Sequence, residues 1–206
     1  MSSMQQEQLS PETEAKLSTV GRKYFKLIEF DEEEVLLKEI RKHPIGRVFI
    51  YLTGGFVALI MAIMFGIFAF GDNSTSLFAG TGIDAGSASG VIAFIGLIII
   101  IFAVVVMVIQ DILYTNNVIF LTNEKLAQVL YINIFNRKIS QLSIGDVQDV
   151  TVTQKGVLAH IFNYGTLVIE TAGEQQNYTF TYVPDPYITS KAIVGAHEQN
   201  LKAFGN

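Results

Sequence analysis

Cysteine and tryptophan are absent from this chain of 206 residues, and charged residues are scarce. The lack of cysteine excludes disulfides, thiolate zinc sites, iron–sulfur clusters and cysteine nucleophiles. Only 16 % of the residues are charged and 50 % are hydrophobic, with a mean hydropathy of +0.40. This composition is too apolar for an ordinary soluble domain or a disordered chain. The net charge of −5 argues against a nucleic-acid partner, which requires a basic face.

Two long uncharged runs carry most of the hydrophobicity, from Val48 to Phe70 and from Val91 to Ile109. Each approaches or exceeds the roughly 20 helical residues that cross the hydrocarbon of a bilayer. We interpret both as transmembrane helices, joined by an external Gly- and Ser-rich loop at 71–90. A core helix of a soluble protein is the alternative, and two such runs in so short a chain argue against it.

Lysine and arginine are distributed unevenly around these runs. The cytoplasmic N-terminal segment that we assign to 1–47 holds eight of them, the loop holds none and the tail after Ile109 holds six. Cytoplasmic segments carry the excess of these cations. We therefore expect a multi-pass protein of the cytoplasmic (inner) membrane, with both termini in the cytoplasm.

Small residues recur along both runs at helical spacing. They are Gly54, Ala58, Ala62 and Gly66 in the first run, and Ser89, Ala93, Gly96 and Ala103 in the second. Such residues let helix backbones approach closely in lipid. We expect an antiparallel hairpin packed through these faces, with self-association of the same faces in a dimer as the rival. Neither span has an ionisable residue in its interior, which argues against a transport pathway.

The tail from Asp111 to Asn206 changes to short β-branched and aromatic runs. These runs predict six antiparallel strands at 117–122, 126–132, 137–142, 147–153, 165–171 and 177–183. Alternation of apolar and polar residues gives several strands one core-facing side. Residues 172–175 predict a hairpin turn, and 154–163 a longer connector with a helical turn.

A helix is predicted after the last strand, with Asp185 as N-cap and Pro186 as its first residue. We expect its core side to consist of Tyr187, Val194, Leu201 and Phe204. His197 lies near that side, and we interpret it as a core or boundary residue and not as a ligand, because no second histidine accompanies it.

Five motifs of the tail occur in the order found in a known family. They are Leu121-Thr122-Asn123-Glu124-Lys125-Leu126, Phe135-Asn136-Arg137-Lys138, Leu142 to Val150, Asn163 to Gly173 and Val183-Pro184-Asp185-Pro186. About the last 95 residues resemble the bacterial pleckstrin-homology (PH) domains of the YdbS-like type, and Glu34 to Pro44 resembles their pre-membrane segment. The resemblance implies an α+β membrane protein: a transmembrane hairpin followed, at 111–206, by a bent antiparallel sheet of about seven strands capped by a C-terminal helix.

The segment before the first run allows two structures. Asp31 is placed as the N-cap of a helix with a Glu34–Lys38 pair, whereas the family resemblance allows a strand instead. The seventh strand that the resemblance implies would come from 35–40 or from an ambiguous segment of the tail. Residues 1 to about 20 are polar and without periodicity, and we expect them to be disordered.

No catalytic, cofactor-binding or metal-binding residues are predicted. The three histidines lack a ligand spacing, and nucleophile, phosphate-loop and dinucleotide motifs are absent from the sequence. In eukaryotic relatives of the fold, basic clusters in the first hairpin bind phosphoinositides. The turn that we align with it, 122–125, has one cation beside one acid, so that site is missing.

One candidate contact remains at the tip of a predicted hairpin, where Ile134 and Phe135 precede Arg137 and Lys138. If this tip faced the bilayer, its apolar pair would enter the interface and its cations would meet anionic headgroups. The interpretation that we favour from sequence places Phe135 in the domain core, because small β domains need every large apolar residue.

Two function classes follow from these observations. The favoured one is a membrane-anchored, non-enzymatic interaction module that binds a protein partner, its own copies or lipid headgroups, with no small-molecule substrate. The alternative is an accessory subunit of an envelope transport or secretion complex.

Overall fold

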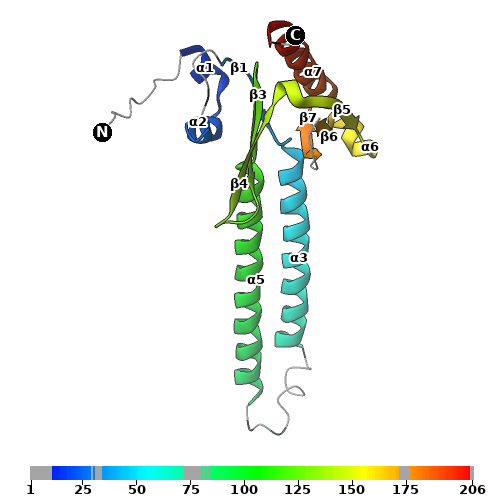
Figure 1. Ribbon diagram of the computed structural model, residues 1–206. Helices are drawn as coiled ribbons and strands as arrows, with labels where there is room; N and C mark the ends of the chain where they lie inside the picture. Colours follow the sequence, from blue (N-terminus) through cyan, green and yellow to red (C-terminus); the bar gives the residue numbers. More distant parts are fainter. Residues whose placement is uncertain are drawn as a thin grey trace, which may run out of the picture. The chain divides into compact units, whose positions relative to one another are not determined.

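The computed structural model describes residues 11–28, 30, 34–71, 80, 82, 84–171 and 177–204. The chain divides into two compact units, a helical unit from Gly46 to Ile112 and a β unit made of the residues on either side of it. The described part of the β unit contains seven strands in two antiparallel sheets (Figure 1). The α+β class expected from the sequence is confirmed.

Two long helices run antiparallel and side by side in the helical unit, α3 (Ile45–Phe70) and α5 (Ala85–Thr115) (Figure 1). Helix α5 begins six residues before the predicted run because Asp84 caps it: its Oδ1 atom accepts a hydrogen bond from the Ser87 N–H at 3.0 Å. Residues 85–90, which we assigned to the external loop, are therefore helical.

The first sheet has the strand order β1-β2-β3-β4. Its strands are β1 (Leu36–Arg41), β2 (Val118–Thr122), β3 (Lys125–Tyr131) and β4 (Arg137–Ser143). Because β1 pairs with β2, the helices are inserted between two neighbouring strands of one sheet. The β unit is thus discontinuous in the sequence.

Strand β1 decides the open choice for the segment before α3. The predicted Glu34–Lys38 pair of a helix is wrong, since Lys38 Nζ donates to Thr189 Oγ1 and Glu34 forms an ion pair with Lys125 at 2.8 Å. Backbone pairing with the edge of β2 outweighs the local helical signal here. The predicted cap, Asp31, lies outside the described residues.

The second sheet contains β5 (Val147–Thr153), β6 (Tyr164–Thr171) and β7 (Tyr178–Pro184). The 3₁₀ turn η1 (Ile144–Asp146) connects it to β4. All six strands predicted after the apolar runs occur within one residue of their expected bounds, and the helical turn expected in the connector is α6 (Val157–Ile161). The predicted turn at 172–175 lies outside the described residues.

Helix α7 (Pro186–Phe204) packs against the second sheet and closes the main core. Its contact face consists of Pro186, Thr189, Ile193 and Ala196, so the predicted face is wrong: Tyr187, Val194 and Leu201 are exposed. The spacing of three and four residues fits one helix face, and its smaller side chains let the helix lie close to the strands. The side chain of Phe204 lies outside the described set.

The outer face of the first sheet is covered by α1 (Pro11–Lys16) and α2 (Thr19–Phe25). Tyr24 and Leu17 pack there against Val118 and Phe120 of β2, while Ile119 and Leu121 face the main core. Strand β2 is therefore buried on both faces, which explains its unbroken apolar sequence. The disorder predicted for residues 11–20 is wrong, and residues 1–10 lie outside the described part.

Candidate functional site

The tip of the β3–β4 hairpin exposes a cluster of apolar side chains. Its turn is fixed by hydrogen bonds from the Ile132 N–H to the Asn136 carbonyl and from the Phe135 N–H to Asn133 Oδ1, at 3.0 and 2.9 Å. Phe135 is 96 % exposed, and Ile132 and Ile134 are also exposed. The favoured core position of Phe135 is therefore wrong: the Asx turn directs this ring outward.

Cations follow the apolar tip directly. Arg137 and Lys138 are the first two residues of β4, and both are exposed. In the strand register they lie opposite Tyr131 and Leu130, at the tip end of β3. Apolar and basic side chains are thus gathered within one turn, and their contact with lipid or a partner stays a prediction.

This tip lies at the sheet end where the chain enters from α5. The Tyr131 N–H, next to the turn, donates to Asn117 Oδ1 at 2.7 Å, and Asn117 is two residues beyond α5. Tyr24 of α2 donates to Tyr131 at 2.8 Å, and this bond holds the pKa of Tyr131 below its usual value. The chain passes between the β unit and the helices twice, from β1 into α3 and from α5 into β2, and we call these two connections the chain crossings. The register therefore brings the tip beside the crossing from α5.

The second crossing carries a cluster of aromatic rings. His43, two residues before α3, donates its backbone N–H to the Tyr182 carbonyl at 2.6 Å, and its ring lies 5.6 Å from that of Tyr164. Its Nδ1 atom accepts a hydrogen bond from the Ile45 N–H at 3.1 Å. Burial lowers the pKa of His43, and the charge of Asp185 partly opposes this shift.

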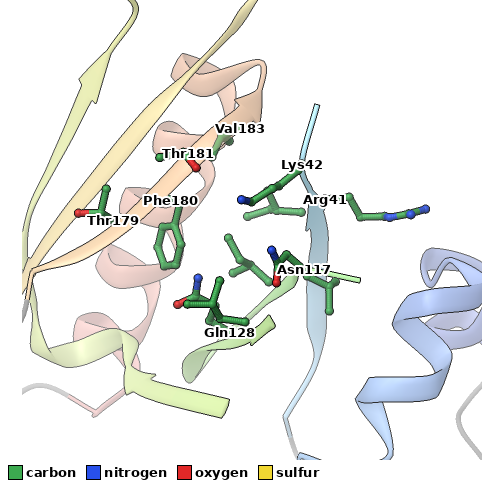
Figure 2. Close-up of a pocket in the computed structure, with 12 residues that line it drawn as sticks. Arg41, Lys42, Asn117, Gln128, Thr179, Phe180, Thr181 and Val183 are labelled. Atoms are coloured by element: carbon green, nitrogen blue, oxygen red, sulfur yellow. The ribbon is translucent and has the colours of Figure 1, made fainter. Parts of the chain in front are cut away.

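A pocket opens between the two sheets near this crossing. It has about 60 Å³ of space for water-sized molecules and lies between the edge strand β1 and strand β7. Figure 2 shows Lys42 pointing from the end of β1 toward Phe180 and Thr181, whereas the side chain of Arg41 points away. The amides of Asn117 and Gln128 also line the space. It accommodates a few water molecules or one small polar group.

Lys42 gives this pocket its charge. Its ammonium group lies 5.1 Å from the centre of the Tyr114 ring, and no carboxylate of the described residues forms an ion pair with it. Burial lowers the pKa of Lys42, because the ammonium group loses hydration. The described lining contains no histidine or carboxylate.

A comparison of the sequence with known protein families finds a match. The Bacterial PH domain family matches residues 47–188, which is more than half of the chain. The chain belongs to the bacterial PH domain family. The match begins within α3 and ends within α7, so it includes both apolar helices and is wider than the region of about 95 residues that the sequence motifs indicated.

Comparison with solved structures finds a protein from Shewanella loihica PV-4, described as a DUF1696 family protein with a pleckstrin-homology domain. The identity is 16 % and the TM-score 0.32, and the match covers 39 % of this chain and 70 % of that one. Comparison with curated proteins finds no match.

The turn that we aligned with a phosphoinositide site is occupied by an internal ion pair in this bacterial PH domain. Lys125 is the cation of the 122–125 turn, and its Nζ atom lies 2.8 Å from the buried Glu34 carboxylate. This turn joins β2 to β3, whereas the first strand connection of the domain, from β1 to β2, contains the two helices. The sequence could not reveal this order, because it allows both a helix and a strand at the position of β1.

The residues predicted to pack the helices have different surroundings. A Cβ atom added to Gly54 would lie 2.8 Å from Met107 Sδ, and one added to Gly96 would lie 2.7 Å from Phe65 Cβ. Each glycine therefore faces a large side chain of the other helix. A Cβ atom at Gly66 would meet nothing within 4 Å. Of the remaining residues, Ala62 is exposed, while Ala58, Ser89, Ala93 and Ala103 are partly buried.

Sequence reasoning missed a further apolar surface on α6. Four exposed apolar side chains gather there: Val157, Leu158, Ile161 and Phe162. Only Ala159 of the helix is buried, so this short helix turns its larger residues outward. The Val-Leu-Ala-His-Ile-Phe run was the available signal, but it looks the same as a core segment until the strands around it are placed.

Histidines and acids form no metal centre in the described part of the chain. His197 is a boundary residue, with Nδ1 2.7 Å from the Ile144 carbonyl oxygen, and the Nδ1 atom of His160 lies 2.9 Å from the Gly156 carbonyl. Both side chains thus have local structural partners.

Proposed function

We propose that this bacterial PH domain protein is a membrane-anchored, non-catalytic interaction module of the YdbS-like type. In it, α3 and α5 span the cytoplasmic membrane, and the β unit contacts lipid headgroups through its β3–β4 tip. A protein partner or a second copy binds the remaining surface of the β unit. The accessory-subunit alternative stays a prediction.

The dimensions and surfaces of the two helices support the anchor. Two candidate spans, of 26 and 30 residues, have mean hydropathies of 2.4 and 3.5. At 1.5 Å per residue they measure about 39 and 45 Å, enough for a hydrocarbon layer of about 30 Å. Their most apolar windows are 0 % and 11 % buried, so their large side chains face outward. This surface fits lipid better than water.

The observation that carries the lipid contact is the exposure of Phe135 at the sheet end next to a chain crossing. If α5 leaves a bilayer at that crossing, the tip is held near the headgroups by a few residues of chain. Phe135 and Ile134 then enter the interface, and Arg137 and Lys138 meet anionic lipids, each contributing about 1 kcal/mol.

A polarity-sensitive dye tests the tip in the full chain, which has no native cysteine. The dye is attached at Phe135→Cys, and the protein is reconstituted into vesicles with and without anionic phosphatidylglycerol. We expect a blue-shifted emission that weakens in the Arg137→Glu and Lys138→Glu backgrounds. A matched control is Val35→Cys, at an exposed position beside the opposite β2–β3 turn. Equal emission at the two sites contradicts lipid contact by the tip.

The orientation has a separate test. Reporter fusions in the 71–84 segment between the two helices and at both termini are expected to show an external connection and cytoplasmic termini. An externally active reporter at Asn206 contradicts the proposed topology.

A further inference from the structure

The exposed apolar face of α6 lies beside the chain crossing into α3. Tyr164 follows α6 by three residues, and its ring contacts that of His43, which is two residues before α3. The Asn163 carbonyl accepts the Asp185 N–H, which ties this connector to the end of β7. The β3–β4 tip lies beside the crossing from α5, so each crossing has one exposed apolar tip next to it.

The two ends of the strands in the β unit also differ in charge. Arg137, Lys138 and Lys155 lie near the strand ends that carry the two tips, whereas the side chain of Lys42 at the same end points into the pocket. Acidic side chains lie toward the opposite strand ends, at Glu34, Glu124, Asp146, Asp149 and Glu170. Two charged residues of the described strand ends depart from this division: the Asp185 carboxylate accepts a hydrogen bond from the Asn163 amide, and Lys125 at the acidic end forms an ion pair with Glu34. Exposed apolar side chains with cations beside them complement an anionic bilayer, because the apolar groups can enter the interface while the cations contact the headgroups.

We propose that α6 and Phe162 form a second interfacial anchor, which inserts Val157 and Ile161 among the headgroups of an anionic bilayer. This inference rests on the proposed membrane anchor. Together with the β3–β4 tip, α6 makes two contacts that restrict rotation of the β unit relative to the membrane. The remaining exposed faces, including that of α7, are then presented to a partner in a fixed orientation.

Single tryptophan residues test this proposal because the native chain has none. The full chain carrying Ile161→Trp is reconstituted into vesicles that contain phosphatidylglycerol and lipids brominated at shallow or deep acyl positions. Ile161 is 67 % exposed, so the substitution leaves the core unchanged. We expect at least twofold stronger quenching by shallow bromines than in the control Val35→Trp, which is exposed at the opposite strand end. Val157→Trp, at a position 74 % exposed, repeats the test if the first variant misfolds.

A fourth variant separates failure of this inference from failure of the anchor. Phe56→Trp lies on the exposed surface of α3 and is expected to be quenched by deep bromines. If the Phe56→Trp chain is quenched while the Ile161→Trp and Val157→Trp chains match the control, the second anchor is overturned and a protein partner becomes the occupant of α6. If the Phe56→Trp chain is not quenched either, the membrane anchor itself is overturned.

Discussion

The helical unit and the β unit use hydrophobic residues in opposite ways. In the helical unit, large side chains such as Leu52 and Phe102 face outward, while Gly96 and Ala88 are buried between the helices. In the β unit, large side chains such as Phe120 and Leu121 are fully buried, and exposed ones lie at the two tips, on α7 and in the segments before α3. Hydrophobic residues therefore have different surroundings in each unit: the large ones lie on the outside of the helices and in the core of the β unit.

The largest expected effect is a cavity in the β-unit core. Ile169 on β6 is fully buried in the main cluster, so Ile169→Ala should lower the free energy of unfolding by about 3 kcal/mol. The matched change Ile63→Ala on the exposed surface of α3 should have little effect in detergent. Urea unfolding followed by near-ultraviolet circular dichroism measures both. If both variants lost the same free energy of unfolding, the proposed difference between the two units would be contradicted.

The next effect concerns the glycines of α3. Gly54→Leu forces a side chain into Met107 and should weaken the α3–α5 contact by about 1–3 kcal/mol, whereas Gly66→Leu should be tolerated because its Cβ position is open. The sequence spacing alone predicts the same damage at both glycines. A cysteine pair placed at the helix ends, in a chain without native cysteine, reports the contact by disulfide crosslinking. Greater damage from Gly66→Leu would contradict the observed helix register.

A smaller effect is expected from the ion pair that joins the other ends of these helices. Arg47 donates two hydrogen bonds to Asp111, with Nε–Oδ1 at 2.6 Å and Nη2–Oδ2 at 3.0 Å. Because the Arg47 side chain is about half exposed, Arg47→Gln should cost roughly 0.5–1 kcal/mol. A double-mutant cycle with Asp111→Asn, read by the same crosslinking, isolates the pair. A coupling energy of zero would contradict a stabilising contribution from this pair.

The smallest expected effect is a pH dependence at the chain crossing into α3. The pKa of His43 is lowered in the folded chain, so the unfolded chain binds the proton more readily below its ordinary pKa of about 6.5. Stability should therefore fall as the pH drops from 7 to 5.5. His43→Asn keeps an acceptor for the Ile45 N–H but does not titrate. Urea midpoints at the two pH values should differ less in this variant, and an equal difference would assign the effect to other groups.

Several elements could be predicted because their signals are local. The β-branched runs predicted all six later strands, and Pro186 predicted the start of α7. Other elements depended on contacts between distant residues. Tyr24 and Leu17 are buried only because β2 presents its outer face to them, so their helices gave little signal alone. Strand β1 likewise requires the edge of β2, which follows the two helices in the sequence.

Some features of the candidate site could likewise be predicted from the sequence, and others could not. The sequence by itself determined the composition of the β3–β4 tip and of the two uncharged helices, because periodicity and turn residues act within a few positions. Only the tertiary structure decided that Phe135 points outward, that Lys42 lines a pocket and that α6 lies beside His43. The positions of Lys42 and α6 bring together residues from opposite sides of the helical insertion, whereas the position of Phe135 depends on the turn between β3 and β4. The physical reason is that exposure is a property of neighbours in space, which periodicity along one segment does not specify.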